Sequence, residues 1–342
     1  MNTEETALLH RTYSIYQGTQ DTPRRQMIYR RNHEQKRDSI TIRQCTVRSV
    51  ETKHIILNDG RTLAYTDCGD PEGIPVFHAH GGPGSRLEGH IFDATAKERG
   101  YRIITIDRPG MGESTYLEGR CLLDYPSDIA ALADHLAIDR FGVTGWSGGG
   151  AHTTVCGYAI PDRLLFNMTF AGYTNFAEMP GAETYLKSRM DQTSVGLSQT
   201  HPRLFRFFFE LMGASEKLMP KAYFDALTKK LCDADRAIAG DTFFQECFMA
   251  EEREAFRQGS RGVATDAAVH YVDWGFSLSE ISCRLHVFHG TEDYIVPVEY
   301  ARDIAAHAPH CELHILEGEG HFFPFRYQDM IFDTADAEMK GK

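Results

Sequence analysis

The sequence predicts a mixed α/β fold in which helices cover both faces of a mostly parallel β-sheet. Short apolar segments with strand character alternate with segments of helical spacing along most of the chain. The alternation stops at about residue 173, only helical segments follow, and the strand pattern returns at residue 284. Strands that alternate with helices are typical of a covered parallel sheet, so the middle block is predicted to be an insertion in one core.

The length of 342 residues fits one large α/β domain with an insertion. We predict an N-terminal arm over residues 1–44, a core formed by residues 45–172 and 276–342, and a helical cap over residues 173–275. The arm is polar and rich in basic residues, which is typical of a solvated arm or of a helix lying on the core. The arm is also a candidate for forming a homodimer.

The composition restricts the partners and the location. The formal net charge of -12 at pH 7 argues against nucleic acid or an anionic membrane as the main partner, because either needs a positive surface. No apolar segment approaches the roughly 20 residues that span a bilayer, and the acidic N-terminus lacks the apolar run of a secretory signal. The eight scattered cysteines form no CxxC pair, so we expect free thiols, a reducing compartment and a cytoplasmic protein.

The elements of the core follow from local patterns. Residues 47–57 and 61–67 alternate between apolar and polar side chains around Asn58-Asp59-Gly60, which is a strong signal for a β-hairpin. Apolar runs and helical spacing predict the rest of this half: strands at 75–79, 101–106, 140–144 and 164–171, and helices at 91–99 and 124–136.

The cap and the second half of the core are predicted in the same way. Within the cap, helical stretches are expected at 185–192, 202–212, 221–232 and 243–257. The core then continues with a strand at 284–288, a helix at 298–308, a strand at 312–316 and a final helix after Pro324.

The most informative motif is Gly-Trp-Ser-Gly-Gly at residues 145–149. It lies between a predicted strand and a predicted helix, and Gly-x-Ser-x-Gly at such a corner forms a nucleophile elbow. The turn is so sharp that the serine adopts strained backbone angles, and the flanking glycines avoid collisions of a Cβ atom with neighbouring elements. We therefore predict that Ser147 is a catalytic nucleophile.

A serine hydroxyl needs a base, and the base needs a group that orients it. In the elbow architecture the acid and then the histidine follow the serine, each on a loop after a later strand. Asp293 follows the strand at 284–288, and His321 follows the strand at 312–316. We predict His321 as the base and Asp293 as its orienter; the alternative orienters are Glu292 and Asp273.

Backbone N–H groups are expected to stabilise the oxyanion, and removal of one such donor typically costs about 3–4 kcal/mol. One donor is predicted at Gly148, directly after the nucleophile. The other is predicted in residues 80–84 (His-Gly-Gly-Pro-Gly), where Gly82 is the first choice and Gly81 the second. Two neighbours are predicted to line the substrate pocket: Trp146 and His80.

The sequence predicts neither a metal nor a cofactor. His78 and His80 resemble a metal-binding pair, but no third ligand suggests itself. Gly110-Met111-Gly112 lacks the context of a dinucleotide-binding motif. The remaining notable histidines are predicted to be structural or exposed: His152, His270, His286 and His289.

Taken together, these motifs resemble the α/β-hydrolase fold superfamily over residues 45–172 and 276–342. The resemblance rests on residues 80–84, the Asp-Arg-Pro-Gly-Met-Gly-Glu-Ser stretch at 107–114, residues 145–149, Asp293 and His321. It implies an α/β-hydrolase fold with an eight-stranded sheet, a helical cap over the active site and no cofactor. It also implies that the loop at 107–114 shapes the floor of the pocket.

Residues 80–84 are similar to the oxyanion loop of proline iminopeptidases. Those enzymes usually carry Trp on the other side of the serine and Gln after the aspartate of the second motif, whereas this chain has Trp146 before Ser147 and Arg108 after Asp107. Epoxide hydrolases and haloalkane dehalogenases resemble the chain too, but their nucleophile is Asp.

We therefore predict a cofactor-independent, carboxylesterase-like serine hydrolase that cleaves an ester or lactone of a moderately apolar small molecule. One alternative is an aminopeptidase or amidase of the proline iminopeptidase type, in which cap carboxylates bind a substrate ammonium. Its candidates are Glu246, Glu251, Glu252 and Glu254. The other alternative is a non-catalytic small-molecule receptor on the same fold.

Overall fold

The computed structural model describes residues 13–17, 25–31 and 50–341. Most of the predicted arm, including the question of a homodimer, lies outside these residues. Within them, no helix is both long and apolar enough to cross a membrane.

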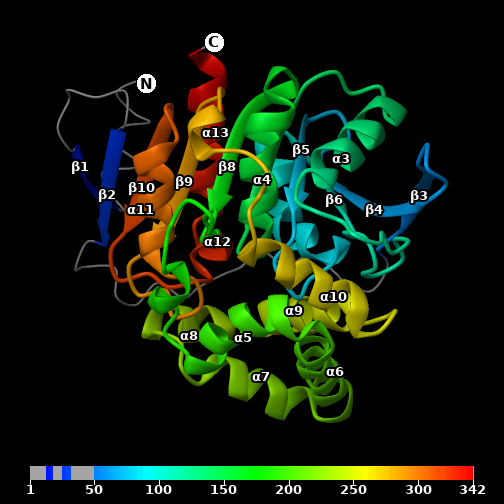
Figure 1. Ribbon diagram of the computed structural model, residues 1–342. Helices are drawn as coiled ribbons and strands as arrows, with labels where there is room; N and C mark the ends of the chain where they lie inside the picture. The colour runs from blue at the N-terminus through cyan, green and yellow to red at the C-terminus, as the bar shows by residue number, and fades with distance from the viewer. Residues whose placement is uncertain (1–12, 18–24, 32–49, 342) are drawn as a thin grey trace.

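Within the described residues, ten strands form a single sheet in the order β1-β2-β10-β9-β8-β7-β5-β6-β4-β3 (Figure 1). The strands from β6 through β10 to β2 run parallel, and β4, β3 and β1 are antiparallel to their neighbours. The strand bounds are β1 Tyr13–Gln17, β2 Arg25–Arg31, β3 Lys53–Ile56, β4 Thr62–Gly69, β5 Ile74–Ala79, β6 Tyr101–Ile106, β7 Phe141–Trp146, β8 Leu164–Phe170, β9 Leu285–Gly290 and β10 Cys311–Leu316.

Strands β3 to β10 correspond to the expected eight-stranded sheet, and two arm strands extend it. β2 pairs in parallel with β10, and Tyr29 stands opposite Leu316. The expectation of a solvated or helical arm is therefore wrong for Arg25–Arg31. The strand pairs the edge of β10, which would otherwise present unpaired backbone groups. Arg25 and Gln26 are both exposed and Met27 and Ile28 are both half-buried, so exposed and buried residues do not alternate regularly along this strand.

Helices cover both faces of this sheet, as the sequence predicts. On one face, Phe77 and Val143 of the sheet pack against Ile129 of α3, whereas on the other face Val76 packs with Phe332 of α13. The core helices are α2 Asp93–Arg99, α3 Asp124–His135, α4 Gly148–Ala159, α11 Val298–His307, α12 Phe323–Arg326 and α13 Gln328–Lys340, and the 3-10 helix η3 covers Arg86–Phe92.

The cap consists of helices joined by loops and lies at one end of the sheet (Figure 1). Its helices are α5 Arg189–Thr200, α6 Pro202–Leu218, α7 Pro220–Thr228, α8 Asp233–Ala239, α9 Thr242–Ala255 and α10 Ser260–Ala268. The predicted helix at 185–192 is displaced, because residues 182–185 form a 3-10 turn and α5 begins after Ser188. Short α8 and α10 were not predicted.

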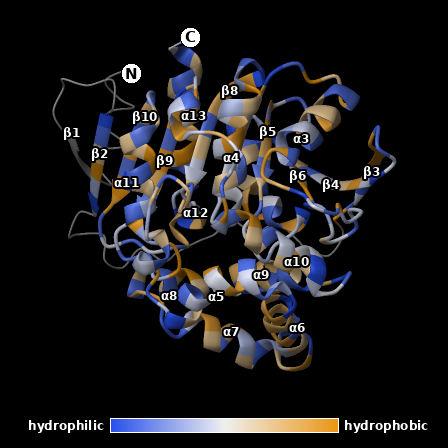
Figure 2. Cartoon of the chain, viewed as in Figure 1, coloured by the Kyte–Doolittle hydropathy of each residue, from blue (hydrophilic) through white to orange (hydrophobic). Residues whose placement is uncertain are grey.

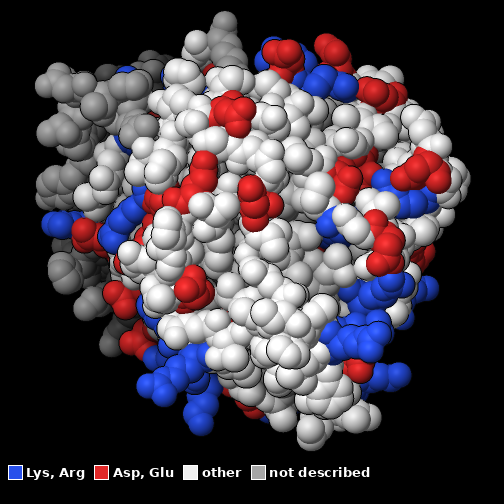
Figure 3. Space-filling model, viewed as in Figure 1, with Lys and Arg blue, Asp and Glu red and all other residues white. Residues whose placement is uncertain are grey.

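The outer surface of the cap is unusually apolar along α6. Figure 2 shows α6 with much hydrophobic character, and Figure 3 shows this part of the cap as a largely uncharged area with Lys and Arg on either side. Phe205 packs inward, but Phe207 and Phe208 are 48% and 41% exposed. Of these three phenylalanines of α6, only Phe205 is therefore part of the buried interior.

Candidate active site

Ser147 occupies the corner between β7 and α4. Its backbone has φ 55° and ψ -122°, a left-handed conformation that a residue with a side chain rarely adopts. A Cβ atom at Gly149 would overlap the carbonyl group of Ala79 on β5, so only glycine permits this close approach. The corner has the strained geometry of a nucleophile elbow.

Asp293 and His321 lie together on the loops that follow β9 and β10. Asp293 Oδ2 and His321 Nδ1 are 2.7 Å apart, while Asp293 Oδ1 accepts hydrogen bonds from the N–H groups of Ile295 and Val296. Burial alone would raise the pKa of Asp293, but His321 and nearby His289 outweigh it and hold this pKa well below its usual range. The ionised carboxylate is therefore suited to orient the imidazole.

The structure distinguishes Asp293 from the alternative orienters. Glu292 and Asp273 are both exposed, whereas Asp293 is 1% exposed and contacts the imidazole directly. The pairing of Asp293 with His321 is thus the one that the fold brings together.

Trp146 links the elbow to the loop of His321. Its indole N–H donates to the carbonyl oxygen of His321 at 2.8 Å, and the two rings have centroids 5.0 Å apart. Across the part of the chain that the structure describes, the Ser147 hydroxyl makes no hydrogen bond with the imidazole of His321. Such contacts are often long in a ligand-free site and shorten when substrate binds.

The two predicted donors of the oxyanion hole are neighbours in space. A Cβ atom built on Gly148 would lie 3.8 Å from the backbone nitrogen of Gly82. The N–H of Gly81 instead donates to Glu88 Oε2 at 2.8 Å. Gly148 and Gly82 are therefore the better pair of candidate donors, and Gly81 is engaged elsewhere.

Trp146 and His80 support the loops of the site from within. His80 is completely buried, its Nδ1 lies 2.7 Å from the carbonyl oxygen of Gly81, and its Nε2 accepts from the N–H of Arg108. Trp146 is 4% exposed and packs against Phe325 as well as His321. The ring of His80 thus holds the loop of residues 80–84 from within, and its place in a substrate pocket stays a prediction.

Sequence analysis missed the function of Arg108, which fastens residues 80–84 to the cap. Its guanidinium donates to the carbonyl oxygens of His80 and Gly81, and it forms a bidentate pair with Asp266 of α10, with both N–O distances 2.7 Å. Arg120 donates to the same carboxylate. Although burial opposes ionisation, Arg108 and Arg120 hold the pKa of Asp266 well below its usual range.

Asp235 of α8 is a second missed residue. Its carboxylate accepts hydrogen bonds from the backbone N–H groups of His321 and Phe322, both at 2.7 Å. A Cβ atom at Gly320 would overlap this carboxylate, so the glycine beside the candidate base was a sequence signal of a close neighbour. No local pattern could identify that neighbour as Asp235.

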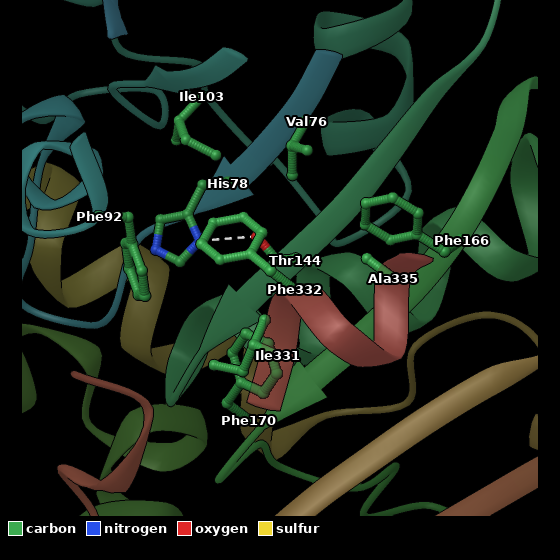
Figure 4. Close-up of a pocket in the computed structure, with 10 residues that line it drawn as sticks. All are labelled: Val76, His78, Phe92, Ile103, Thr144, Phe166, Phe170, Ile331, Phe332 and Ala335. Carbon is green, nitrogen blue, oxygen red and sulfur yellow. Dashed lines mark hydrogen bonds between the residues drawn. The ribbon is translucent and has the colours of Figure 1, made fainter. Parts of the chain in front are cut away.

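His78 does not join His80 in a metal site. Its Nε2 lies 2.7 Å from Glu88 Oε1 and its Nδ1 lies 2.9 Å from Thr144 Oγ1. Figure 4 shows the His78 ring in a small apolar pocket on the α13 face of the sheet, with the contact to Thr144 dashed. Ser147 is not among the residues that line this pocket. His78 therefore supports Glu88, which in turn holds the N–H of Gly81.

Three similar proteins indicate how far the likeness extends. The uncharacterized hydrolase YcgS of Bacillus subtilis is 26% identical over 281 residues, which are 80% of this chain and 92% of that protein. A proline iminopeptidase of Xanthomonas citri is 39% identical over 98 residues, which are 27% of this chain and only 30% of that protein. The solved structure of an esterase, RhEst1 from Rhodococcus, has a TM-score of 0.60 at 18% identity, covers 84% of this chain and 98% of its own, and so is alike in fold.

The family model described as the alpha/beta hydrolase family matches residues 76–334. The matched segment runs from β5 into α13 and includes the elbow, both catalytic candidate loops and the whole cap. Because this match covers most of the sequence and agrees with the sheet order and the inserted cap, the chain belongs to the alpha/beta hydrolase family.

Proposed function

We propose that the protein is a serine hydrolase that cleaves a carboxylic ester or lactone through an acyl-enzyme intermediate. The observation that carries the proposal is the 2.7 Å contact between Asp293 and His321 on loops beside the strained corner of Ser147. An imidazole that is oriented by a buried carboxylate and held next to a serine elbow is the arrangement that activates a hydroxyl group.

Each group has a role in the proposed reaction. His321 removes the proton of Ser147 as its oxygen attacks the substrate carbonyl, and Asp293 stabilises the imidazolium that forms. The N–H groups of Gly82 and Gly148 donate to the oxyanion. His321 then protonates the departing alkoxide. Water, deprotonated by His321, attacks the acyl-enzyme and releases the acid and the free serine.

An ester or lactone of moderately apolar character fits the surroundings of His321. Phe322 follows it directly, and Phe244 and Phe248 of α9 pack on Phe322 with ring centroids 5.1 and 5.8 Å away. An alkoxide is also an easier leaving group than an amine. The aromatic contact between cap and catalytic loop therefore favours an apolar substrate.

Replacement of Ser147 tests the proposal. We expect Ser147→Ala to lower kcat for p-nitrophenyl esters by about 10⁴-fold or more and to abolish labelling by a fluorophosphonate, with an unchanged circular dichroism spectrum. Ser215→Ala, on the outer helix α6, is the matched control and should retain activity and label. Full activity of Ser147→Ala would refute the assignment, and an unlabelled, inactive wild-type protein would favour a receptor instead.

An aminopeptidase is the second candidate, and Glu251 is the observation that favours it. Of the four candidate glutamates in the cap, Glu246 is exposed and Glu254 forms ion pairs with Arg86 and Arg257. Glu251 is fully buried beside Glu88, and burial together with this neighbour raises the pKa of Glu251 well above its usual range. A substrate ammonium placed there would offset the cost of burying the carboxylate.

Substrate panels distinguish the two candidates. Steady-state kinetics on p-nitrophenyl esters of increasing acyl length would be compared with kinetics on proline naphthylamide. We expect turnover of the esters and little turnover of the amide. The reverse preference, together with a rise in KM for the amide in Glu251→Gln, would establish the aminopeptidase.

A further inference from the structure

Three potential metal ligands lie on one face of the sheet, in the half of β9 and β10 that precedes the catalytic loops. His286 belongs to β9, and Glu312 and His314 belong to β10, where residues two apart point to the same side. In the parallel register, His286 stands opposite Glu312. β9 and β10 lie side by side, and β2 is next to β10 (Figure 1). These strands thus bring two imidazoles and one carboxylate together.

Two of the three distances between the ligand atoms are close to those of a tetrahedral metal site. His286 Nδ1 lies 3.2 Å from His314 Nε2, which lies 3.6 Å from Glu312 Oε1, and the three atoms are within 4.8 Å of one another. Two atoms that each bind zinc at about 2.0–2.1 Å with a tetrahedral angle are about 3.4 Å apart. The separations therefore leave room for one ion between the three side chains.

The outer nitrogen of each imidazole faces an oxygen atom. Tyr29 Oη lies 3.0 Å from His314 Nδ1, and Glu338 Oε2 of α13 lies 3.5 Å from His286 Nε2. Histidine ligands of metals usually donate their second N–H to such oxygens, which fixes the tautomer and turns the lone pair toward the ion. The ring of His314 has such a contact with Tyr29, whereas His286 Nε2 faces Glu338 at 3.5 Å without a hydrogen bond.

A hydrogen bond between the two imidazoles is the alternative to a metal ion. If His314 Nε2 donated to His286 Nδ1, His314 Nδ1 would accept from Tyr29 Oη and His286 Nε2 would carry a proton that faces Glu338. That Nε2 makes no hydrogen bond within the described residues, although His286 is only 3% exposed. A metal ion would take both inward lone pairs and let both outer nitrogens carry protons.

We propose that His286, His314 and Glu312 bind one zinc ion, with water in the fourth position. Two imidazoles and one carboxylate suit zinc, and Glu312 is partly exposed, which gives the ion access from solvent. The ion ties β9 to β10, and Tyr29 extends the site to β2. The site is thus structural: it fastens the arm strand to the hydrolase sheet and takes no part in the proposed hydrolysis.

Metal titration tests the site. The full-length protein would be stripped with a chelator and titrated with ZnCl₂ by isothermal calorimetry, and with CoCl₂ by visible absorption. We expect one tight zinc per chain, cobalt bands of a tetrahedral site, and a higher Tm with zinc. Glu312→Gln should weaken zinc binding at least tenfold and His286→Asn should abolish it; Tyr29→Phe should weaken it about 10–100-fold.

The matched control is His310→Asn, which removes an exposed histidine at the same end of the sheet. This variant should bind zinc like the wild type, and zinc removal should leave ester turnover of the folded protein unchanged. If His286→Asn does not fold, Glu312→Gln alone decides. Absence of a tight site, equal affinity in Glu312→Gln, or an equal loss in His310→Asn would overturn the proposal.

Discussion

The core and the cap contribute to the candidate site in different ways. The core supplies the groups proposed to react, Ser147, Asp293 and His321, each at the end of a strand. The cap supplies carboxylates that hold core loops from the other side: Asp266 holds Arg108, and Asp235 holds the backbone of His321. The ends of the strands thus position the candidate catalytic groups. The rigidity of the loops that carry these groups depends on cap helices that are distant in the sequence.

This contrast teaches that the cap is more than a lid over the substrate. Asp266 and Asp235 are both fully buried and both fix loops that carry candidate catalytic groups. With these contacts, the cap contributes to the free energy of unfolding of the whole protein. Disruption of single cap carboxylates should therefore affect both stability and turnover, and carboxylates on the cap surface should affect neither.

The largest effect is expected for Asp266→Asn. The substitution keeps the size of the side chain but leaves the buried guanidinium groups of Arg108 and Arg120 without a counter-charge. Breaking one partner of a buried ion pair typically costs about 3–5 kcal/mol. We expect a decrease of this size in the free energy of unfolding, measured by urea denaturation.

A second ion pair between core and cap provides the control for Asp266. Glu118 pairs with Arg261 of α10, and the two side chains are 79% and 49% exposed. Exposed pairs typically contribute about 0–1 kcal/mol, so Glu118→Gln should change stability little. Equal effects of the two substitutions would show that burial of the cap contact does not matter.

The next effect concerns Glu252, which is buried in α9. Burial raises its pKa to about 8 from the ordinary 4.5. Between these values the unfolded chain releases a proton that the folded chain retains, so stability falls as pH rises from about 4.5 to 8. In Glu252→Gln, the decrease in unfolding free energy between pH 5 and pH 8 should be smaller, by on the order of 3 kcal/mol.

Glu246→Gln is the companion variant, because Glu246 lies exposed on the same helix. Its unfolding free energy should follow that of the wild type at every pH between 5 and 8. If Glu252→Gln retained the pH profile of the wild type, Glu252 would ionise normally in the folded protein. Carboxylates in the interior and on the surface of the cap would then ionise alike.

Most of the core could be predicted because its signals are local. The hairpin around Gly60, the apolar runs of β5 to β10 and the elbow at Ser147 are each encoded in fewer than about a dozen neighbouring residues. The strand β2 was missed because exposed and buried residues do not alternate regularly along it, and pairing with β10 over a long sequence separation provides its stability. In the cap, short α8 and α10 depend on packing rather than on propensity.

The same distinction between local and long-range signals applies to the candidate site. Asp293 and His321 were predicted because a known strand order places them, and in the structure Asp293 Oδ2 lies 2.7 Å from His321 Nδ1. Arg108 was seen only as a departure from a motif, because its partner Asp266 lies 158 residues away in the sequence. Reasoning from local patterns identifies residues proposed to react more readily than the residues that hold them.

Asp235→Asn sharpens the comparison with the smallest expected effect. The amide can accept only one of the two backbone hydrogen bonds from His321 and Phe322, and its NH₂ group faces the other N–H. A lost hydrogen bond to a charged group costs about 1.5–3 kcal/mol, so kcat should decrease about 10–100-fold with little change in KM.

Asp233→Asn, an exposed position on the same helix, should leave both constants unchanged. A change in KM alone, or a similar loss in both variants, would mean that Asp235 only shapes the cap; a selective loss of kcat would mean that a cap carboxylate positions the proposed base.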